Sequence, residues 1–164
     1  VYVCCTQGNK EDDEEMKFGK LRTLRGQVTV VGGVARANLI VANGLINYGL
    51  KVSRFTMWNE LNPTGGSSQK FTGILSLDTI ITGSRMNASD NRQIAWTSYS
   101  TLSGDGLISP IREMIDPDHI VNRDLFLTMN DSTTGTYNYL IECQVVELSD
   151  DEAIITIIKE TSQS

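Results

Sequence analysis

Residues 137–160, YNYLIECQVVELSDDEAIITIIKE, decide the fold because a strand and the element that follows it can both be predicted there. Residues 137–148 are mostly β-branched, aromatic and aliphatic, which is typical of a strand with one well-buried face. Ser149 then precedes Glu152 by three positions, the spacing of a capping box at the start of a helix. This stretch therefore predicts an inner strand that leads into a short C-terminal helix.

The predicted helix is apolar but contains few good helix formers. Ile154, Ile155, Ile157 and Ile158 are β-branched, and such side chains lose rotamer freedom in a helix. A helix of this kind needs a surface to pack on. If it does not dock, a further strand is the alternative for these residues.

Length and composition indicate a single domain. With 164 residues, 40% of them hydrophobic, the chain can bury one complete core and is short for two. It has no apolar run of the roughly 18 to 20 residues that cross a bilayer, and its first residues, VYVCCTQGNK, lack the features of a signal peptide. We therefore expect no membrane association.

The three cysteines suit a reducing compartment. Cys4, Cys5 and Cys143 cannot all pair within one chain, and the first two are adjacent. No His or second cysteine pair stands at ligand spacing from Cys4 and Cys5, so we predict free thiols rather than a metal or redox site. Cys143, in the middle of the predicted strand, is expected to be a small core residue.

Charge is distributed unevenly along the chain, whose net charge is −6. Residues 16–59 contain seven Lys or Arg residues and no acid, whereas residues 105–164 contain three basic and twelve acidic residues. This asymmetry predicts a basic face for a polyanion and an acidic remainder that keeps the protein soluble. Residues 1–16, which include the acidic block 11–15, are expected to form a mobile arm ahead of one domain over residues 17–164.

The best candidates for contacts with nucleic-acid phosphates are Lys17, Lys20, Arg22 and Arg25. These cations precede or open a strand that the alternation of residues 27–30 predicts. An alternative of equal weight is that they form a solvated strand edge, which discourages aggregation.

Alternating and apolar segments predict further strands over residues 51–60, 71–81, 93–99 and 120–129. Polar loops are predicted over residues 62–69, 83–91 and 100–109. The alternation of the first of these strands places Val52, Arg54, Thr56 and Trp58 on one side. Trp58 is expected to be a core or interface aromatic, with a base-stacking platform as the alternative.

Other segments predict turns or leave two structures open. Gly32-Gly33 predicts a turn, Asn43-Gly44 a two-residue hairpin, and residues 130–136 a polar hairpin loop. Residues 34–41 could instead form a helix, and residues 110–118 could hold a short helical turn.

Motifs for catalysis are weak. Asp116 and Asp118 stand beside His119, the one histidine, but no nucleophile or metal shell accompanies them, so a turn with local hydrogen bonds is the simpler interpretation. The Gly104-Asp105-Gly106 stretch is not framed by a phosphate-binding motif. We therefore predict no catalytic residue, no metal site, no cofactor and no enzyme activity.

Six to eight strands separated by polar loops predict an all-β fold, a single jelly-roll β-sandwich with a short C-terminal helix. Because tight hairpins would suffice to join strands, loops of this length usually exist to meet partners.

Several stretches resemble capsid (coat) proteins of small circular single-stranded DNA viruses. They are Ile94-Ala95-Trp96, residues 116–121 (DPDHIV), Asp124-Leu125-Phe126, and the ending from residues 138–142 (NYLIE) to residues 158–160 (IKE). The resemblance covers roughly residues 50–160 and consists of strand order and residue character.

This resemblance implies a jelly-roll subunit that assembles inside the host cell with copies of itself into an icosahedral shell, the virion, around a viral genome. Such a subunit performs no chemistry, and its partners are other subunits, the genome and a host receptor of unspecified kind. Capsid proteins of this class usually carry an Arg-rich N-terminal arm, whereas this sequence begins with an acidic segment. Either a basic arm precedes Val1 or residues 17–25 supply a reduced one.

A carbohydrate- or receptor-binding β-sandwich module that does not assemble is the alternative function. The long polar loops and two Asn-X-Ser sequons, at Asn87 and Asn130, favour it. This alternative predicts a secreted precursor and saccharide binding without assembly.

Overall fold

The computed structural model describes residues 17–42, 44–60, 69–79, 85–101, 108–131 and 134–162. Within these ranges the chain forms strands and one helix: β1 (Lys17–Val30), β2 (Gly33–Leu39), β3 (Tyr48–Asn59), β4 (Gln69–Ser76), β5 (Gln93–Thr101), β6 (Ile108–Ile115), β7 (Ile120–Val121), β8 (Leu125–Asp131), β9 (Gly135–Glu147) and α1 (Asp150–Ser162). The predictions for Cys4, Cys5 and the acidic arm over residues 1–16 concern residues outside these ranges.

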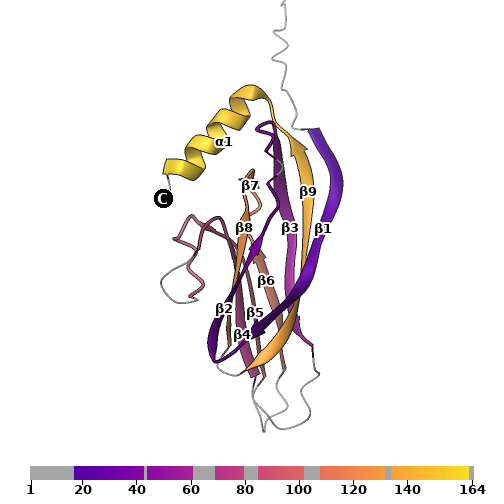
Figure 1. Cartoon of the computed structure of the whole chain (residues 1–164), viewed down its shortest axis with the longest axis vertical. Coiled ribbons are helices and arrows are strands. Elements are labelled where there is room, and N and C mark those ends of the chain that lie inside the picture. The colour runs from indigo at the N-terminus through magenta and orange to yellow at the C-terminus, as the bar shows by residue number, and fades with distance from the viewer. Residues whose placement is uncertain are drawn as a thin grey trace, which may run out of the picture.

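The strands form two antiparallel sheets that face each other (Figure 1). The first sheet has the order β1-β9-β3-β7, and the second has the order β2-β8-β4-β5-β6. The predicted all-β sandwich with a short C-terminal helix is therefore confirmed, and β9 is the inner strand that residues 137–148 predict.

The strand pairs are nested along the chain. The first and last strands, β1 and β9, pair with each other, and inside them β2 pairs with β8. Further inside, β3 pairs with β7, and β4 pairs with β5. From β1 to β4 the chain therefore alternates between the two sheets, and it alternates again from β6 to β9. The strands β4, β5 and β6 all lie in the second sheet.

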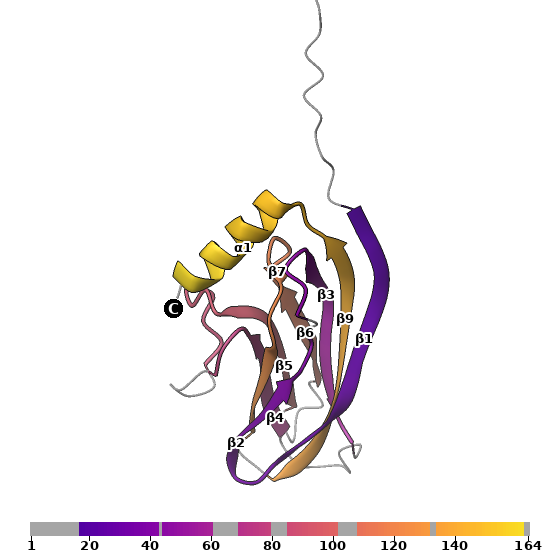
Figure 2. The ribbon, with the colours of Figure 1, turned by 45° about the horizontal axis from the view of Figure 1, so that its top comes forward.

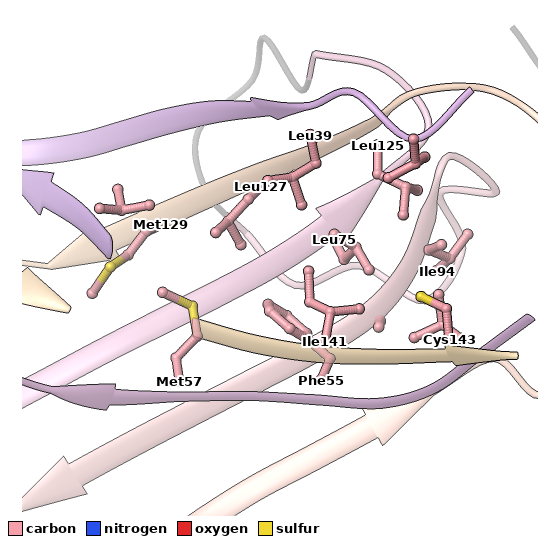
Figure 3. Packing of buried hydrophobic residues seen from close by; sticks show 14 of the residues in the cluster. Leu39, Phe55, Met57, Leu75, Ile94, Leu125, Leu127, Met129, Ile141 and Cys143 are labelled. Atoms are coloured by element: carbon pink, nitrogen blue, oxygen red, sulfur yellow. The ribbon is translucent and has the colours of Figure 1, made fainter. Parts of the chain in front are cut away.

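Apolar side chains from both sheets meet between the layers (Figure 3). This core forms because β-strand side chains alternate between two faces, so one face of each strand can be apolar throughout. Cys143 is fully buried there, as predicted for a small core residue. Members with no exposed surface include Val30, Phe55, Met57, Leu75, Leu125, Leu127, Met129 and Ile141.

Two helical alternatives are wrong. Residues 34–41, which could have been a helix, lie in β2 and the segment after it. Residues 110–118 form most of β6 and a turn rather than a helical turn. Pro110 is tolerated in β6 because this strand is at the edge of its sheet, where a missing N–H donor costs little.

The strand predicted over residues 120–129 is two strands in different sheets. β7 belongs to the first sheet and β8 to the second, and residues 122–124 cross between them. The carboxylate of Asp124 fixes this crossing, because it accepts hydrogen bonds from the backbone N–H groups of Val41 (3.0 Å) and Ala42 (3.1 Å). The sequence marks the crossing only as the polar triplet Asn122-Arg123-Asp124, which separates the apolar residues of β7 from those of β8.

The two predicted hairpins are also wrong, because the strands on either side of each do not pair. Asn43-Gly44 stands between β2 and β3, and residues 130–136 include the connection between β8 and β9; both connections join different sheets. Asn43 itself lies outside the described residues. The turn at Gly32-Gly33 is confirmed, since both residues have positive φ angles, 63° and 113°, that favour glycine.

Several strand ends differ from prediction. β4 ends at Ser76, well before residue 81, and β5 and β6 extend into the loop predicted over residues 100–109. The alternation predicted for β3 fails at Val52, which is buried although Arg54 is exposed. The cause is an irregular step in the pairing of β3 with β9 between Val52 and Arg54, which shifts the alternation by one residue.

Helix α1 begins with the predicted capping box. The Ser149 backbone N–H donates to a Glu152 carboxylate oxygen at 2.9 Å, and the Glu152 N–H donates to the Ser149 hydroxyl at 3.4 Å. The helix leans across the end of the sandwich where β9 ends and β1 begins (Figure 2). Its Ala153 is buried with Val146 and Leu148, and no helix in the described residues is long and apolar enough to cross a membrane.

Candidate functional site

The four predicted phosphate-binding cations all lie on β1, which is at the edge of its sheet and, among the described strands, pairs with β9 alone. Lys17, Lys20, Arg22 and Arg25 are all exposed. Their positions therefore suit both interpretations of this segment, because an exposed basic edge can meet phosphates and can also discourage sheet-to-sheet aggregation.

The cations of β1 do not share one face. Arg22 stands opposite Cys143, on the side of the sheet that also carries the buried Val28, whereas Arg25 stands three positions further on and points to the outer side. Lys17 stands opposite Glu147, and Lys20 lies in an irregular step of the pairing between Phe18 and Leu21. Arg25 is therefore the cation of this group that the regular register places on the outer face.

Arg22 and Arg123 line a small cavity at the end of the sandwich. Its volume is about 30 Å³, which is room for one water molecule. Burial raises the pKa of the neighbouring Cys143 thiol to about 11, although the positive charge of Arg22 acts in the opposite direction. Cys143 is therefore a protonated core residue at neutral pH and not a reactive thiolate.

A larger hollow, of about 270 Å³, lies across the first sheet where β1, β9 and β3 meet the end of β6. We call it the Phe18 pocket. It is lined by residues of these strands and of the turn after β6: Phe18, Lys51, Val52, Ser53, Ile115, Pro117 and Gln144. The Lys51 ammonium lies 5.9 Å from the centroid of the Phe18 ring.

The charged groups next to the Phe18 pocket are partly paired. Arg54 lies 3.7 Å from the Glu113 carboxylate and 3.8 Å from that of Glu142. In the part of the chain that the structure describes, Lys51 takes part in no ion pair. The pocket therefore offers an aromatic ring beside a cation that forms no ion pair with the residues described.

The residues around His119 form a local turn, as predicted. The Asp118 backbone N–H donates to the Asp116 carboxylate at 3.1 Å, which is the side-chain hydrogen bond expected for such a turn. Across the described ranges, no group of three or more His, Cys, Asp and Glu side chains is placed to hold a metal ion.

Large apolar side chains are exposed in several places. On α1 these are Ile154, Ile155, Ile157 and Ile158. Others lie in the connection before β3, which is tied to the helix because the Asn47 amide donates to the Asp150 carboxylate at 2.7 Å: they are Ile40, Leu45 and Ile46. Trp58, at 42% exposure, lies on the outer side of β3 and is not a core residue.

Sequence reasoning missed the Phe18 pocket. Phe18 is visible as an aromatic residue inside a basic segment, a pattern that could have marked it as a contact for nucleic acid. Its neighbours Lys51 and Gln144 come from other strands, so they could be found only once the register of three strands was known.

No protein-family profile matches this chain, and no curated protein matches it either. Its function is therefore argued from the sheets, the pocket and the exposed surfaces.

Proposed function

We propose that the protein is a viral capsid subunit, a jelly roll that assembles with copies of itself into a small icosahedral shell around a nucleic-acid genome. It performs no chemistry, forms the virion, and assembles inside the host cell. The observation that carries this proposal is the nested pairing of the strands.

Nested pairing supports a jelly roll for a geometric reason. When β6 is set aside as an extra edge strand, the pairs β1·β9, β2·β8, β3·β7 and β4·β5 are those of one long hairpin. A hairpin of this kind that is rolled up gives two four-stranded sheets with Greek-key connections, which is the jelly roll of viral capsid and lectin domains.

The exposed apolar residues favour the capsid over a monomeric module. Isolated soluble domains rarely expose contiguous apolar patches, whereas subunits of assemblies expose them before they associate. The isoleucines of α1 are poor helix formers, so their cost in helix stability is offset if another copy of the chain covers them.

The basic edge of the first sheet supports a polyanionic partner. Lys17, Lys20, Arg22 and Arg25 are exposed on β1, and the resemblance to capsid proteins of single-stranded DNA viruses suggests the genome as that partner. A basic arm ahead of Val1 and a host receptor remain parts of the same proposal.

Electron microscopy of the purified chain, combined with sedimentation velocity and the ratio of absorbance at 260 and 280 nm, tests the proposal. Round particles of uniform size that contain nucleic acid are expected. A protein that stays monomeric at every salt concentration and pH would contradict assembly, and saccharide binding by such a monomer would favour the alternative module.

A double substitution in α1 tests the contact surface. Ile154→Ser with Ile158→Ser removes apolar surface that is exposed in the subunit, so the fold should persist while particles fail to form. The control is Val34→Ser with Ile111→Ser, which removes exposed apolar side chains from the second sheet. Equal assembly by both variants would exclude α1 as a subunit contact.

A further inference from the structure

We propose that the Phe18 pocket binds one nucleotide of single-stranded nucleic acid, with the base against the Phe18 ring and the phosphate at Lys51. The inference rests on the proposed function only in taking the packaged genome as the natural source of that nucleotide. The shared chemistry is an anionic phosphate joined to a flat aromatic base.

The pocket is built by strand pairing, so its parts are held in place. Leu21 on β1 and Lys51 on β3 both stand opposite Gln144 on β9, which puts Gln144 in the middle of the pocket floor. Phe18 borders the pocket from β1, while Ile115 and Pro117 border it beyond β3.

Both irregular steps in the pairing of β9 lie at this pocket. One is between Phe18 and Leu21 on β1, and the other is between Val52 and Arg54 on β3. Irregular steps of this kind re-aim side chains and are frequent beside binding sites. In this sheet they bring Phe18 and Ser53 to the same hollow, which regular pairing on both sides of β9 would not do.

The side chains match the three parts of a nucleotide. Phe18 is 52% exposed, and a partly exposed ring on a rigid strand is a platform on which a base can stack. Lys51 supplies a cation for the phosphate, while the Gln144 amide both donates and accepts and can therefore bond a base edge. Ile115 and Pro117 add apolar wall for the base.

Charge around the pocket favours an anion. Lys51 forms no ion pair in the described ranges, and the carboxylates of Glu113 and Glu142 lie within 4 Å of the Arg54 guanidinium. Arg25 lies on the same outer face of β1, so a strand that leaves the pocket along β1 meets a second cation. The pocket therefore has an exit that suits a phosphodiester backbone.

The size of the pocket suits one base and not a duplex. Its volume of about 270 Å³ is just below the range of about 300 to 1,000 Å³ that is usual for ligand pockets. A paired base keeps its face covered by its neighbours in the stack, so only an unstacked base can use the Phe18 ring.

The test is fluorescence anisotropy of a labelled oligothymidylate with the purified full chain, at one fixed salt concentration. Phe18→Ala should weaken binding by about 5- to 100-fold, the range for loss of one base-stacking ring. The matched control is Trp58→Ala, because Trp58 is an exposed aromatic of the same outer face that does not line the pocket. That variant should bind like the unmodified chain.

Lys51 provides a second, independent measurement. Lys51→Gln should weaken binding and lower the slope of log K against log salt concentration by about 0.7, the value for one phosphate contact on a single strand. Lys51→Arg should restore most of the affinity. The two Lys51 variants test nucleotide binding by the pocket even if Phe18→Ala fails to fold. They should fold, because Lys51 is only partly buried and makes no ion pair in the described ranges.

Two further binding measurements distinguish a single strand from a free nucleotide and from a duplex. Thymidine monophosphate, titrated by calorimetry, tests a free nucleotide, and a duplex of the same length tests double-stranded nucleic acid. The proposal expects the oligothymidylate to bind more tightly than both. Tighter binding of the free nucleotide, or equal binding of the duplex, would overturn the assignment to a single strand.

Assembly is measured on the same samples by sedimentation, so the two proposals fail separately. If Phe18→Ala and Trp58→Ala bind the oligonucleotide alike, the pocket assignment is wrong whether or not shells form. If the unmodified chain never assembles but Phe18→Ala still selectively loses binding, the capsid proposal is wrong and the nucleotide pocket remains.

Discussion

At the scale of single residues, Gly73 marks a close approach between the two sheets. A Cβ atom at this position would lie 2.5 Å from the Met57 sulfur, 2.8 Å from the Thr97 Cγ2 and 3.3 Å from the Phe55 ring. Met57 and Phe55 belong to β3 in the facing sheet, so a Cβ at residue 73 requires the packed side chains of Met57 and Thr97 to shift.

We therefore expect Gly73→Ala to lower the free energy of unfolding by about 1 to 3 kcal/mol, the usual cost of overpacking a core. Urea denaturation followed by circular dichroism measures it. Gly19→Ala is the matched control, since a Cβ there meets its nearest atom, the Val145 carbonyl oxygen, at 3.4 Å. Equal midpoints for the two variants would contradict the close approach.

Cys143 gives the protein a stability term that depends on pH. Burial raises the pKa of its thiol from 9.0 to about 11 in the folded state. Between these values the unfolded chain releases the thiol proton and the folded chain keeps it, so unfolding becomes more favourable as pH rises. The term is fully present below pH 9 and is lost as pH rises through 11.

The expected loss between pH 9 and 11 is about 1 to 3 kcal/mol, because one pKa unit corresponds to about 1.4 kcal/mol. Cys143→Ala should be less stable at pH 8, because it leaves a cavity, but its stability should fall less steeply between pH 9 and 11. Denaturant midpoints for both proteins across this range measure the difference. Parallel curves would show that the thiol does not contribute.

At the scale of elements, α1 depends on its first turn because little of it is buried. Ser149→Ala removes the hydroxyl that caps the Glu152 N–H, so the helix should lose about 1 kcal/mol of local stability. Hydrogen exchange of the amides in residues 153–158 should accelerate about fivefold. Ser149→Asp keeps a capping oxygen and should restore protection, and equal exchange in both variants would argue against the cap.

Sequence patterns predicted the elements whose causes are local. The capping box of Ser149 and Glu152 lies within four residues, and β9 was predicted from the β-branched, aromatic and aliphatic residues of its own segment. Predictions failed where contacts with residues distant in the sequence determine to which sheet a segment belongs. Asn122-Arg123-Asp124 interrupts the apolar residues 120–129, but the change of sheet at this triplet depends on tertiary contacts, in which Asp124 accepts hydrogen bonds from the backbone of Val41 and Ala42.

The candidate site also has one part that the sequence predicted and one part that it did not. The basic character of β1 can be read from composition, and all four of its cations are exposed. The Phe18 pocket could not be predicted, because Phe18, Lys51 and Gln144 come together only through the register of three strands. Two irregular steps also shift that register, and alternation in the sequence shows neither of them.

At the scale of the whole molecule, the nested strand pairs place the start of β1 beside the end of β9. Helix α1 follows β9 directly, so the start of the basic strand β1 and the start of α1 lie at the same end of the sandwich (Figure 1). In the shell that we propose, Lys17 at the start of β1 and the exposed isoleucines of α1 therefore belong to the same end of each subunit.

The contribution of β1 to that polyanion contact is measurable through salt. Replacing Lys17, Lys20, Arg22 and Arg25 by Gln removes up to four phosphate contacts, each worth about 0.7 in the slope of log K against log salt for a single strand. The slope for oligothymidylate should therefore fall by up to about 2.8, with the fold unchanged because all four side chains are exposed.

The control removes the same charge from the second sheet and its connections: Arg36, Lys70, Arg85 and Arg112, all exposed, are replaced by Gln. If net charge alone governed binding, both variants would lose the same slope. A loss confined to the β1 variant locates the contact on the basic edge, because counterion release counts only the cations that touch phosphate. A smaller loss, near 0.7 to 1.4, would mean that only the cations of one face of β1 reach the strand, since Arg22 and Arg25 point to opposite sides.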